Sequence, residues 1–291
     1  MSAPHLWRSE LLGRSRTIEL KQGRLQCFTR GTGPPLVFCH GWLANANLWR
    51  KVIAQLADRF TCVALDLPLG SHRIPMDPGA ELSPNGCGAL IADALDALEL
   101  DEVTLVGNDS GGAYSQIAVA ERPGRVARLV LNSCETPYDE FPPPPFDGLP
   151  AAAGSAETLG MLLGALRDRA LRVTPPAYGL LIKHPIDEQA SDSYALPCLE
   201  DAEILRDTAK VMSSARSAPV HEAGAQLIES FRQPVLLAWS PEDRVFAPAN
   251  ARLYSEALQH GRLELIDDAY SFTPEDQPAA LAQAIAAFAA P

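Results

Sequence analysis

A run of small residues surrounds one acidic side chain in the segment 103–112, which reads VTLVGNDSGG. An apolar stretch leads into the segment, and a stretch with helical spacing follows it. A tight turn between a strand and a helix holds its central residue in a strained conformation and points it to solvent above the sheet. Gly107 and Gly111 let the two backbones pass closely because they lack a Cβ, and their spacing places Asp109 at the tip. The segment therefore predicts Asp109 as a nucleophile.

Ser110 is the alternative nucleophile of the same turn. A Gly-x-Ser-x-Gly pattern centred on Ser110 requires glycine at 108, where the sequence has Asn108, so we favour Asp109. A serine hydroxyl needs a base before it can attack, whereas a carboxylate is already ionised at neutral pH. A carboxylate can displace a halide or open an epoxide directly and leaves an alkyl ester. Water must then hydrolyse that ester, and this second step needs a base and an oxyanion hole.

Strands and helices must alternate around this turn in order to position it. Short apolar strands are predicted at 17–20, 25–29, 36–39, 60–67, 103–106, 126–131, 234–239 and 263–266, and helices at 48–56, 90–98, 113–120 and 278–288. Near-continuous apolar strands separated by helices predict a mostly parallel sheet that is covered on both faces. The expected fold class is therefore α/β.

The alternation stops in the middle of the chain. Prolines cluster at 142–145 and 175–176, and helical stretches at 159–171 and 200–212 lie between and after them. We interpret residues 136–230 as a helical cap inserted into a core made of residues 1–135 and 231–291. A lid of this kind can shape a pocket and exclude water from it.

Over nearly its whole length the chain resembles the α/β-hydrolases. The resemblance rests on the strand that ends in His40-Gly41, the turn at 107–112, the helical insertion after the sixth strand, and the strand with an acidic turn at 234–243. An aspartate at the turn is similar to the branch of haloalkane dehalogenases and epoxide hydrolases. The resemblance implies the α/β-hydrolase fold and an oxyanion hole made by the backbone N–H groups of Trp42 and Ser110.

The resemblance implies an acid and a histidine base beside the nucleophile. Two acids are candidates: Asp243 follows the seventh strand, and Glu135 follows the sixth. The histidine belongs to the turn after the last strand, but alignment of the Pro-Glu-x-x-Pro tail puts Ser271 in its place. A serine cannot hold a proton at neutral pH. His72, on the loop after the fourth strand, is the candidate substitute, since ligands bind at the carboxyl edge of open α/β sheets.

Several further side chains are expected to line the substrate pocket. His40 and Trp42 belong to the turn after the third strand, Tyr178 and Tyr194 to the cap, and Tyr270 to the turn that holds Ser271. In epoxide hydrolases, cap tyrosines protonate the opening oxygen. In dehalogenases, a tryptophan commonly follows the nucleophile and holds the halide, whereas this chain has Ser110 there.

Composition limits the partners. The net charge of −12 over 291 residues argues against nucleic acid or an anionic membrane, because both bind basic surfaces. The six cysteines show no Cys-x-x-Cys spacing, so we expect neither a metal site nor a disulfide framework, and a reducing cytoplasm fits best. No signal peptide, membrane span or cofactor motif is recognised. The excess of arginine over lysine indicates a bacterial source, and a homodimer stays open.

Three functions remain in competition. The first is a hydrolase that acts on a small epoxide or alkyl halide through an ester on Asp109. The second is a lyase, isomerase or cyclase in which Asp109 acts as a general base without hydrolysis. The third is a ligand-binding protein on a hydrolase scaffold that turns nothing over. We favour the hydrolase.

Overall fold

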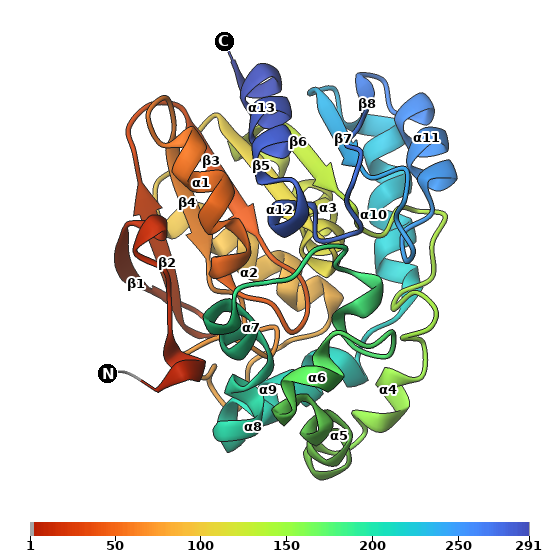
Figure 1. The fold of residues 1–291 in the computed structure, drawn as a ribbon. Helices are drawn as coiled ribbons and strands as arrows, with labels where there is room; N and C mark the ends of the chain where they lie inside the picture. The colour runs from red at the N-terminus through yellow and green to blue at the C-terminus, as the bar shows by residue number, and fades with distance from the viewer. Residues whose placement is uncertain (1–2, 291) are drawn as a thin grey trace.

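The computed structural model describes residues 3–290. Its centre is one eight-stranded sheet with the strand order β1-β2-β4-β3-β5-β6-β7-β8 (Figure 1). The strands are β1 Arg14–Leu20, β2 Gly23–Arg30, β3 Pro35–Cys39, β4 Thr61–Leu65, β5 Val103–Asn108, β6 Val126–Asn132, β7 Val235–Trp239 and β8 Gly261–Leu265. The pairs β1·β2 and β2·β4 are antiparallel, and every other pair is parallel. The predicted mostly parallel sheet is confirmed.

Helices cover both faces of the sheet, because the central strands are apolar on both sides. The core helices are α1 Arg50–Leu56, α2 Pro84–Ala97, α3 Ser110–Glu121, α10 Ser217–Ser230, α11 Pro248–Ala257, α12 Thr273–Asp276 and α13 Pro278–Ala289. Leu105 of β5 packs in a cluster with side chains of α2, α3, α10 and α11. The next residue, Val106, points to the opposite face and packs with α1 and α13. This alternation fixes the order of the layers.

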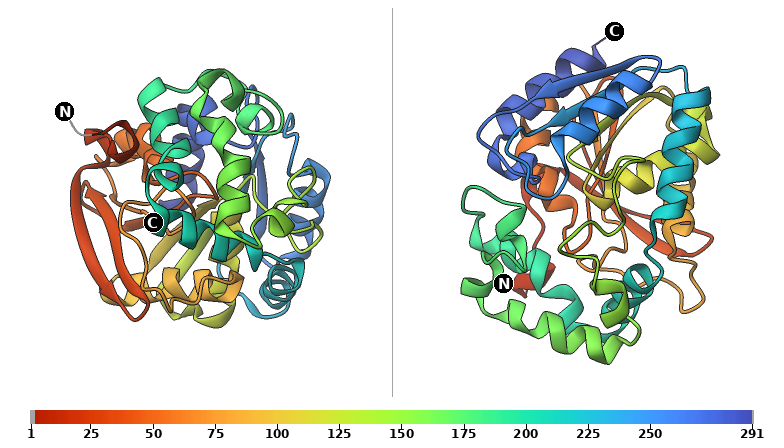
Figure 2. Two further views of the ribbon diagram at one scale, coloured as in Figure 1. Left: turned by 90° about the horizontal axis from the view of Figure 1, so that it is seen from below. Right: turned by 90° about the vertical axis from the view of Figure 1, so that its right-hand side faces the viewer.

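The cap is a group of short helices on the edge where the parallel strands end (Figure 2). It consists of α4 Leu149–Ala152, α5 Ala156–Leu163, α6 Arg169–Arg172, α7 Glu188–Ala195, α8 Pro197–Glu200 and α9 Ala202–Ser213. Helix α10, which falls inside the expected cap range 136–230, packs against α3 of the core instead. Among residues 3–290, no helix has both the length and the apolar composition that crossing a bilayer requires.

The single helix expected at 159–171 is the one clear difference in secondary structure. Helix α5 ends at Leu163, a 3-10 turn follows at Gly164–Arg167, and α6 begins after Asp168. The Asp168 carboxylate accepts a hydrogen bond from the Ala170 N–H at 2.9 Å. This N-cap satisfies a free backbone donor and starts a new helix, so the periodic stretch is broken into two.

Candidate active site

Asp109 stands at a sharp turn between β5 and α3. Its backbone has φ 55° and ψ −144°, outside the broad region of ordinary residues, and its N–H donates to the Ser133 carbonyl at 3.0 Å. The flanking glycines explain how the turn closes: a Cβ on Gly107 would lie 2.6 Å from the Gly112 Cα, and a Cβ on Gly111 would lie 2.3 Å from the His40 carbonyl oxygen. The strained residue is therefore held by close backbone packing on both sides.

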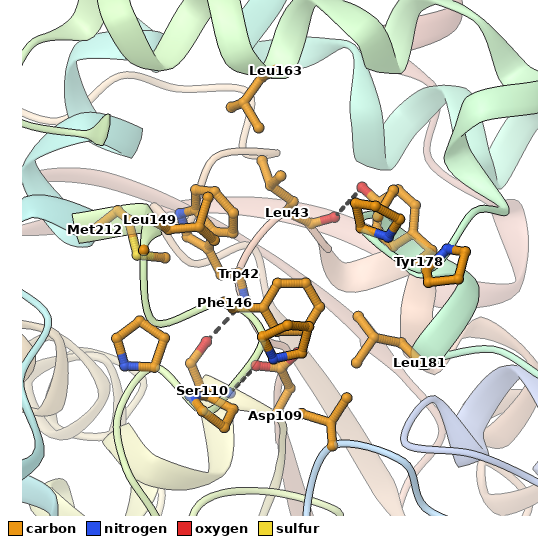
Figure 3. Close-up of a pocket in the computed structure, with 18 of the residues that line it drawn as sticks. Trp42, Leu43, Asp109, Ser110, Phe146, Leu149, Leu163, Tyr178, Leu181 and Met212 are labelled. Carbon is orange, nitrogen blue, oxygen red and sulfur yellow. Dashed lines mark hydrogen bonds between the residues drawn. The ribbon is translucent and has the colours of Figure 1, made fainter. Parts of the chain in front are cut away.

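Two backbone N–H groups make hydrogen bonds to Asp109 and its neighbour Ser110 (Figure 3). The N–H of Ser110, the first residue of α3, donates a short hydrogen bond to Asp109 Oδ1. The N–H of Trp42 donates to the Ser110 hydroxyl at 2.9 Å. These are the two groups that the sequence predicts as an oxyanion hole. One donates directly to the carboxylate, and the other donates to the hydroxyl of the neighbouring Ser110.

Asp109 opens into a cavity of about 750 Å³ between the core and the cap. The floor is made by core residues such as Trp42, Ser110 and Val245, and the roof by cap residues such as Leu163 and by the proline segments 142–145 and 175–176. Among the described residues that line it, Asp109 and Glu135 alone carry acidic groups, and none is a lysine, arginine or histidine. The cavity therefore favours a neutral, largely apolar ligand.

Burial raises the pKa of both carboxyl groups of the cavity. Burial raises the pKa of Asp109 to about 7, against the opposing effect of the hydrogen bonds from Ser110 and with a further contribution from the Asp243 charge. Burial and then the Asp109 charge raise the pKa of Glu135 well above its ordinary value. Like charges in a poorly solvated space disfavour ionisation of both carboxyl groups at once.

Asp243 and Ser271 form a hydrogen-bonded pair near the turn that carries Asp109. The Ser271 hydroxyl donates to Asp243 Oδ1 at 2.7 Å, and the same oxygen accepts from the backbone N–H groups of Val245 and Phe246 at 2.9 Å each. The Ser271 carbonyl accepts from Asn108 Nδ2 at 2.8 Å, which ties the turn of Ser271 to the residue before Asp109. Asp243 therefore contacts Ser271, the residue that aligns with the histidine of the family. No hydrogen bond in the described chain joins Glu135 to Ser271.

The prediction of His72 as a substitute base is wrong for a packing reason. His72 is buried, and its Nε2 lies 3.3 Å from Oδ2 of Asp207 on α9. Asp207 also accepts the Met76 N–H at 2.8 Å, so the imidazole belongs to a contact between the core loop and the cap. His72 does not line the cavity.

His40 is also absent from the cavity wall, contrary to prediction. Its Nδ1 lies 2.9 Å from the Gly41 carbonyl and its Nε2 accepts the Leu67 N–H at 2.9 Å, so both ring nitrogens are used. Burial lowers the pKa of His40 to about 4, which keeps the ring neutral. It is a structural residue that holds the turn after β3.

Of the three tyrosines expected in the pocket, only Tyr178 lines it, and its hydroxyl donates to the Leu43 carbonyl at 2.8 Å. Tyr194 points away and donates to Glu275 at 2.7 Å. Tyr270 packs against Arg244, whose guanidinium carbon lies 4.0 Å from the ring centre. The prediction for Tyr194 and Tyr270 is therefore wrong.

Sequence reasoning missed most of the apolar wall. Tyr114 of α3 lines the cavity, and its ring packs edge-on against Phe141 with 5.7 Å between the ring centres. Its position four residues after Ser110 on the same helix could have indicated this, since such residues share a face. The proline segments of the cap offered no comparable signal. Across residues 3–290, no group of acidic, histidine or cysteine side chains could hold a metal ion.

Comparison with known proteins shows what the chain is similar to. Residues 34–159 match the family model described as alpha/beta hydrolase fold. Haloalkane dehalogenase 2 of Mycobacterium tuberculosis (strain ATCC 25618 / H37Rv) is 36% identical over 120 residues, which cover 41% of each chain. Soluble epoxide hydrolase of Corynebacterium sp. (strain C12) is 32% identical over 109 residues, 37% of each chain. The alignments thus span less than half the length of these relatives.

The solved structure of the epoxide hydrolase CorEH has a similar fold along the whole chain. Its TM-score is 0.77 at 20% identity, and the match covers 94% of this chain and 98% of that one. The match supports the arrangement of sheet, helices and cap, and at this identity it concerns the fold alone. The chain is therefore a protein of the α/β-hydrolase fold, with haloalkane dehalogenases and epoxide hydrolases among its sequence relatives.

Proposed function

We propose that the chain is a hydrolase in which the Asp109 carboxylate attacks an electrophilic carbon of a neutral epoxide or alkyl halide. The observation that carries this proposal is the position of Asp109, at the strained turn and open to the apolar cavity. Attack by one carboxylate oxygen breaks the carbon–halogen or carbon–oxygen bond and leaves an alkyl ester. Oδ1 already accepts the Ser110 N–H, so the developing oxyanion of ester hydrolysis would find a donor in place.

Trp42 supports the same reaction on the leaving-group side. It lines the cavity, and its indole Nε1 is buried without a hydrogen-bond partner in the described chain. A buried donor that lacks a partner is costly, and a halide or an opening oxygen would satisfy it. A single indole N–H binds an anion only modestly. An epoxide oxygen that also receives a proton therefore suits this site better than a halide.

The test is covalent capture. The protein is incubated with a series of terminal epoxides and primary alkyl bromides, and intact-protein mass spectrometry follows the ester, with peptide mapping to Asp109. We expect adduct formation that rises with pH through about 7, because the nucleophile must be ionised. Asp109→Asn should form no adduct. Absence of both adduct and product with wild-type protein over the whole series would contradict the proposal.

A second candidate function rests on the missing histidine and on the pKa of Asp109. A carboxylate whose pKa is about 7 is suited to act as a general base in an elimination, isomerisation or ring closure. Exchange of substrate hydrogens with D₂O, without an ester on Asp109, would favour this function over hydrolysis. A binding protein without turnover would show neither reaction.

A further inference from the structure

Glu135 is the buried ionisable group of the cavity that this reaction leaves unused. It is 1% exposed, it lines the cavity together with Asp109, and its Oε2 has no hydrogen-bond partner in the described chain. An ionised carboxylate in that environment would leave this oxygen without compensation. A protonated carboxyl group fits it, and a protonated carboxyl group is a proton donor.

The backbone fixes Glu135 beside the nucleophile. Strands β5 and β6 run parallel with Asn108 paired to Asn132, and Asp109 N–H bonds the carbonyl of Ser133, two residues before Glu135. On the other side, the Gln116 side chain of α3 donates to the Glu135 carbonyl at 2.7 Å. The two acids thus stand on neighbouring strand ends, held by the helix that begins at the nucleophile.

The two cap tyrosines predicted as proton donors are already engaged. The Tyr178 hydroxyl donates to the Leu43 carbonyl, and the Tyr194 hydroxyl donates to Glu275 outside the cavity. No histidine lines the described cavity wall. The Ser271 hydroxyl does not ionise near neutral pH. An epoxide opening needs a proton on the ring oxygen as the bond breaks, and the base of ester hydrolysis is equally unassigned.

We propose that Glu135 is the acid and the base of the reaction, and this rests on the proposed function of Asp109. In the first step, Asp109 Oδ attacks a ring carbon, the carbon–oxygen bond breaks, and the ring oxygen takes the Glu135 proton. The products are a hydroxyalkyl ester and a Glu135 carboxylate. In the second step, that carboxylate takes a proton from water as the water attacks the ester carbonyl. The carbon–oxygen bond of the ester breaks, and the departing alkoxide takes the remaining proton of the attacking water. The diol leaves, and Asp109 carboxylate and protonated Glu135 are restored.

This cycle identifies epoxides as the substrate class that turns over. A halide leaves without a proton, so alkylation of Asp109 by an alkyl halide leaves Glu135 protonated and without the means to activate water. The alkyl bromide ester should therefore persist, whereas the ester from an epoxide should be hydrolysed. The apolar wall and the absence of a lining cation select neutral, apolar epoxides.

The experiment compares wild-type protein, Glu135→Gln and Glu157→Gln, a control on the exposed face of cap helix α5. Each is incubated with a terminal epoxide and with the matching alkyl bromide, and adduct and diol are followed by mass spectrometry across pH. We expect Glu135→Gln to keep bromide alkylation of Asp109 and to lose epoxide opening by about 10²-fold or more. The alkaline limb of the epoxide profile, which reports the protonated acid, should disappear in this variant, and Glu135→Asp should retain part of it.

The bromide arm separates the two proposals. Bromide alkylation in Glu135→Gln shows that the variant is folded and that its nucleophile works. If that variant then opens the epoxide at the wild-type rate, the role of Glu135 is overturned while the function of Asp109 stands. If wild-type protein forms an ester with neither compound, the proposed function itself fails, and the inference fails with it. If Glu135→Gln does not fold, an unchanged alkaline limb in Glu135→Asp would overturn the role of Glu135.

Discussion

At the residue scale, the sequence was sufficient to place Asp109 at the tip of the turn but not to predict its surroundings. Gly107 and Gly111 are local features that predict the turn directly, and the structure closes the turn through them. His72 could not be judged in this way, because its partner Asp207 lies 135 residues further along the chain. Local spacing reports backbone geometry, whereas the orientation of a loop side chain depends on what the distant cap places against it.

Ser271 provides a residue-scale prediction. Its hydroxyl donates to Asp243 at 2.7 Å, so a histidine at this position would have a carboxylate partner for one ring nitrogen. We expect Ser271→His to shorten the lifetime of the alkyl bromide ester on Asp109 by a factor of about 10²–10⁴, because a general base becomes available for water. Ser271→Ala is the matched control and should leave the ester long-lived. A lifetime in Ser271→His equal to that of the control would show that the imidazole does not reach the ester.

At the element scale, prediction succeeded in the core and was weaker in the cap. The central strands are short apolar runs buried on both faces, so their type follows from composition alone. The cap helices are mostly four to eight residues long, and contacts with the core rather than periodicity determine where they end. This is why the proline segments that roof the cavity could be assigned to a cap but not to a wall.

Asp276 joins the cap to the core and provides a prediction at this scale. Its carboxylate accepts the N–H groups of Lys183 and His184 from the cap segment and the N–H of Tyr270 from the turn that carries Ser271. Removal would leave buried donors unpaired, so Asp276→Ala should lower the free energy of unfolding by about 2–4 kcal/mol in urea titrations. The exposed Asp147→Ala serves as control. A loss below about 0.5 kcal/mol would mean that water replaces the carboxylate at no cost.

At the scale of the whole molecule, the chain has an excess of acidic groups and yet buries two of them in one apolar cavity. Ion pairs tie the cap to the core around this cavity: Lys183 contacts Glu242 at 2.7 Å and Asp268 at 2.9 Å. Since these ion pairs are partly exposed, each by itself contributes little to the free energy of unfolding. Apolar packing must therefore offset the free energy that burial of the two acids costs. That free energy depends on pH.

The sign of this dependence gives the last prediction. In the unfolded chain Asp109 has its ordinary pKa of 3.8, and in the folded protein burial raises the pKa to about 7. Between these values the folded state binds more protons than the unfolded state, so stability falls as the pH rises, and the full cost is present above pH 7. Asp109→Asn removes this titration while an amide oxygen can still accept the Ser110 N–H. The variant should therefore be more stable than wild-type protein at pH 8, by on the order of 2–4 kcal/mol, and similar to it near pH 4.

Urea unfolding at both pH values measures the difference, with Asp147→Asn as the exposed control. Equal stability of wild-type protein and Asp109→Asn at pH 8 would mean that Asp109 titrates as a solvated acid, and the proposed role of Asp109 as a nucleophile with a raised pKa would lose its physical basis.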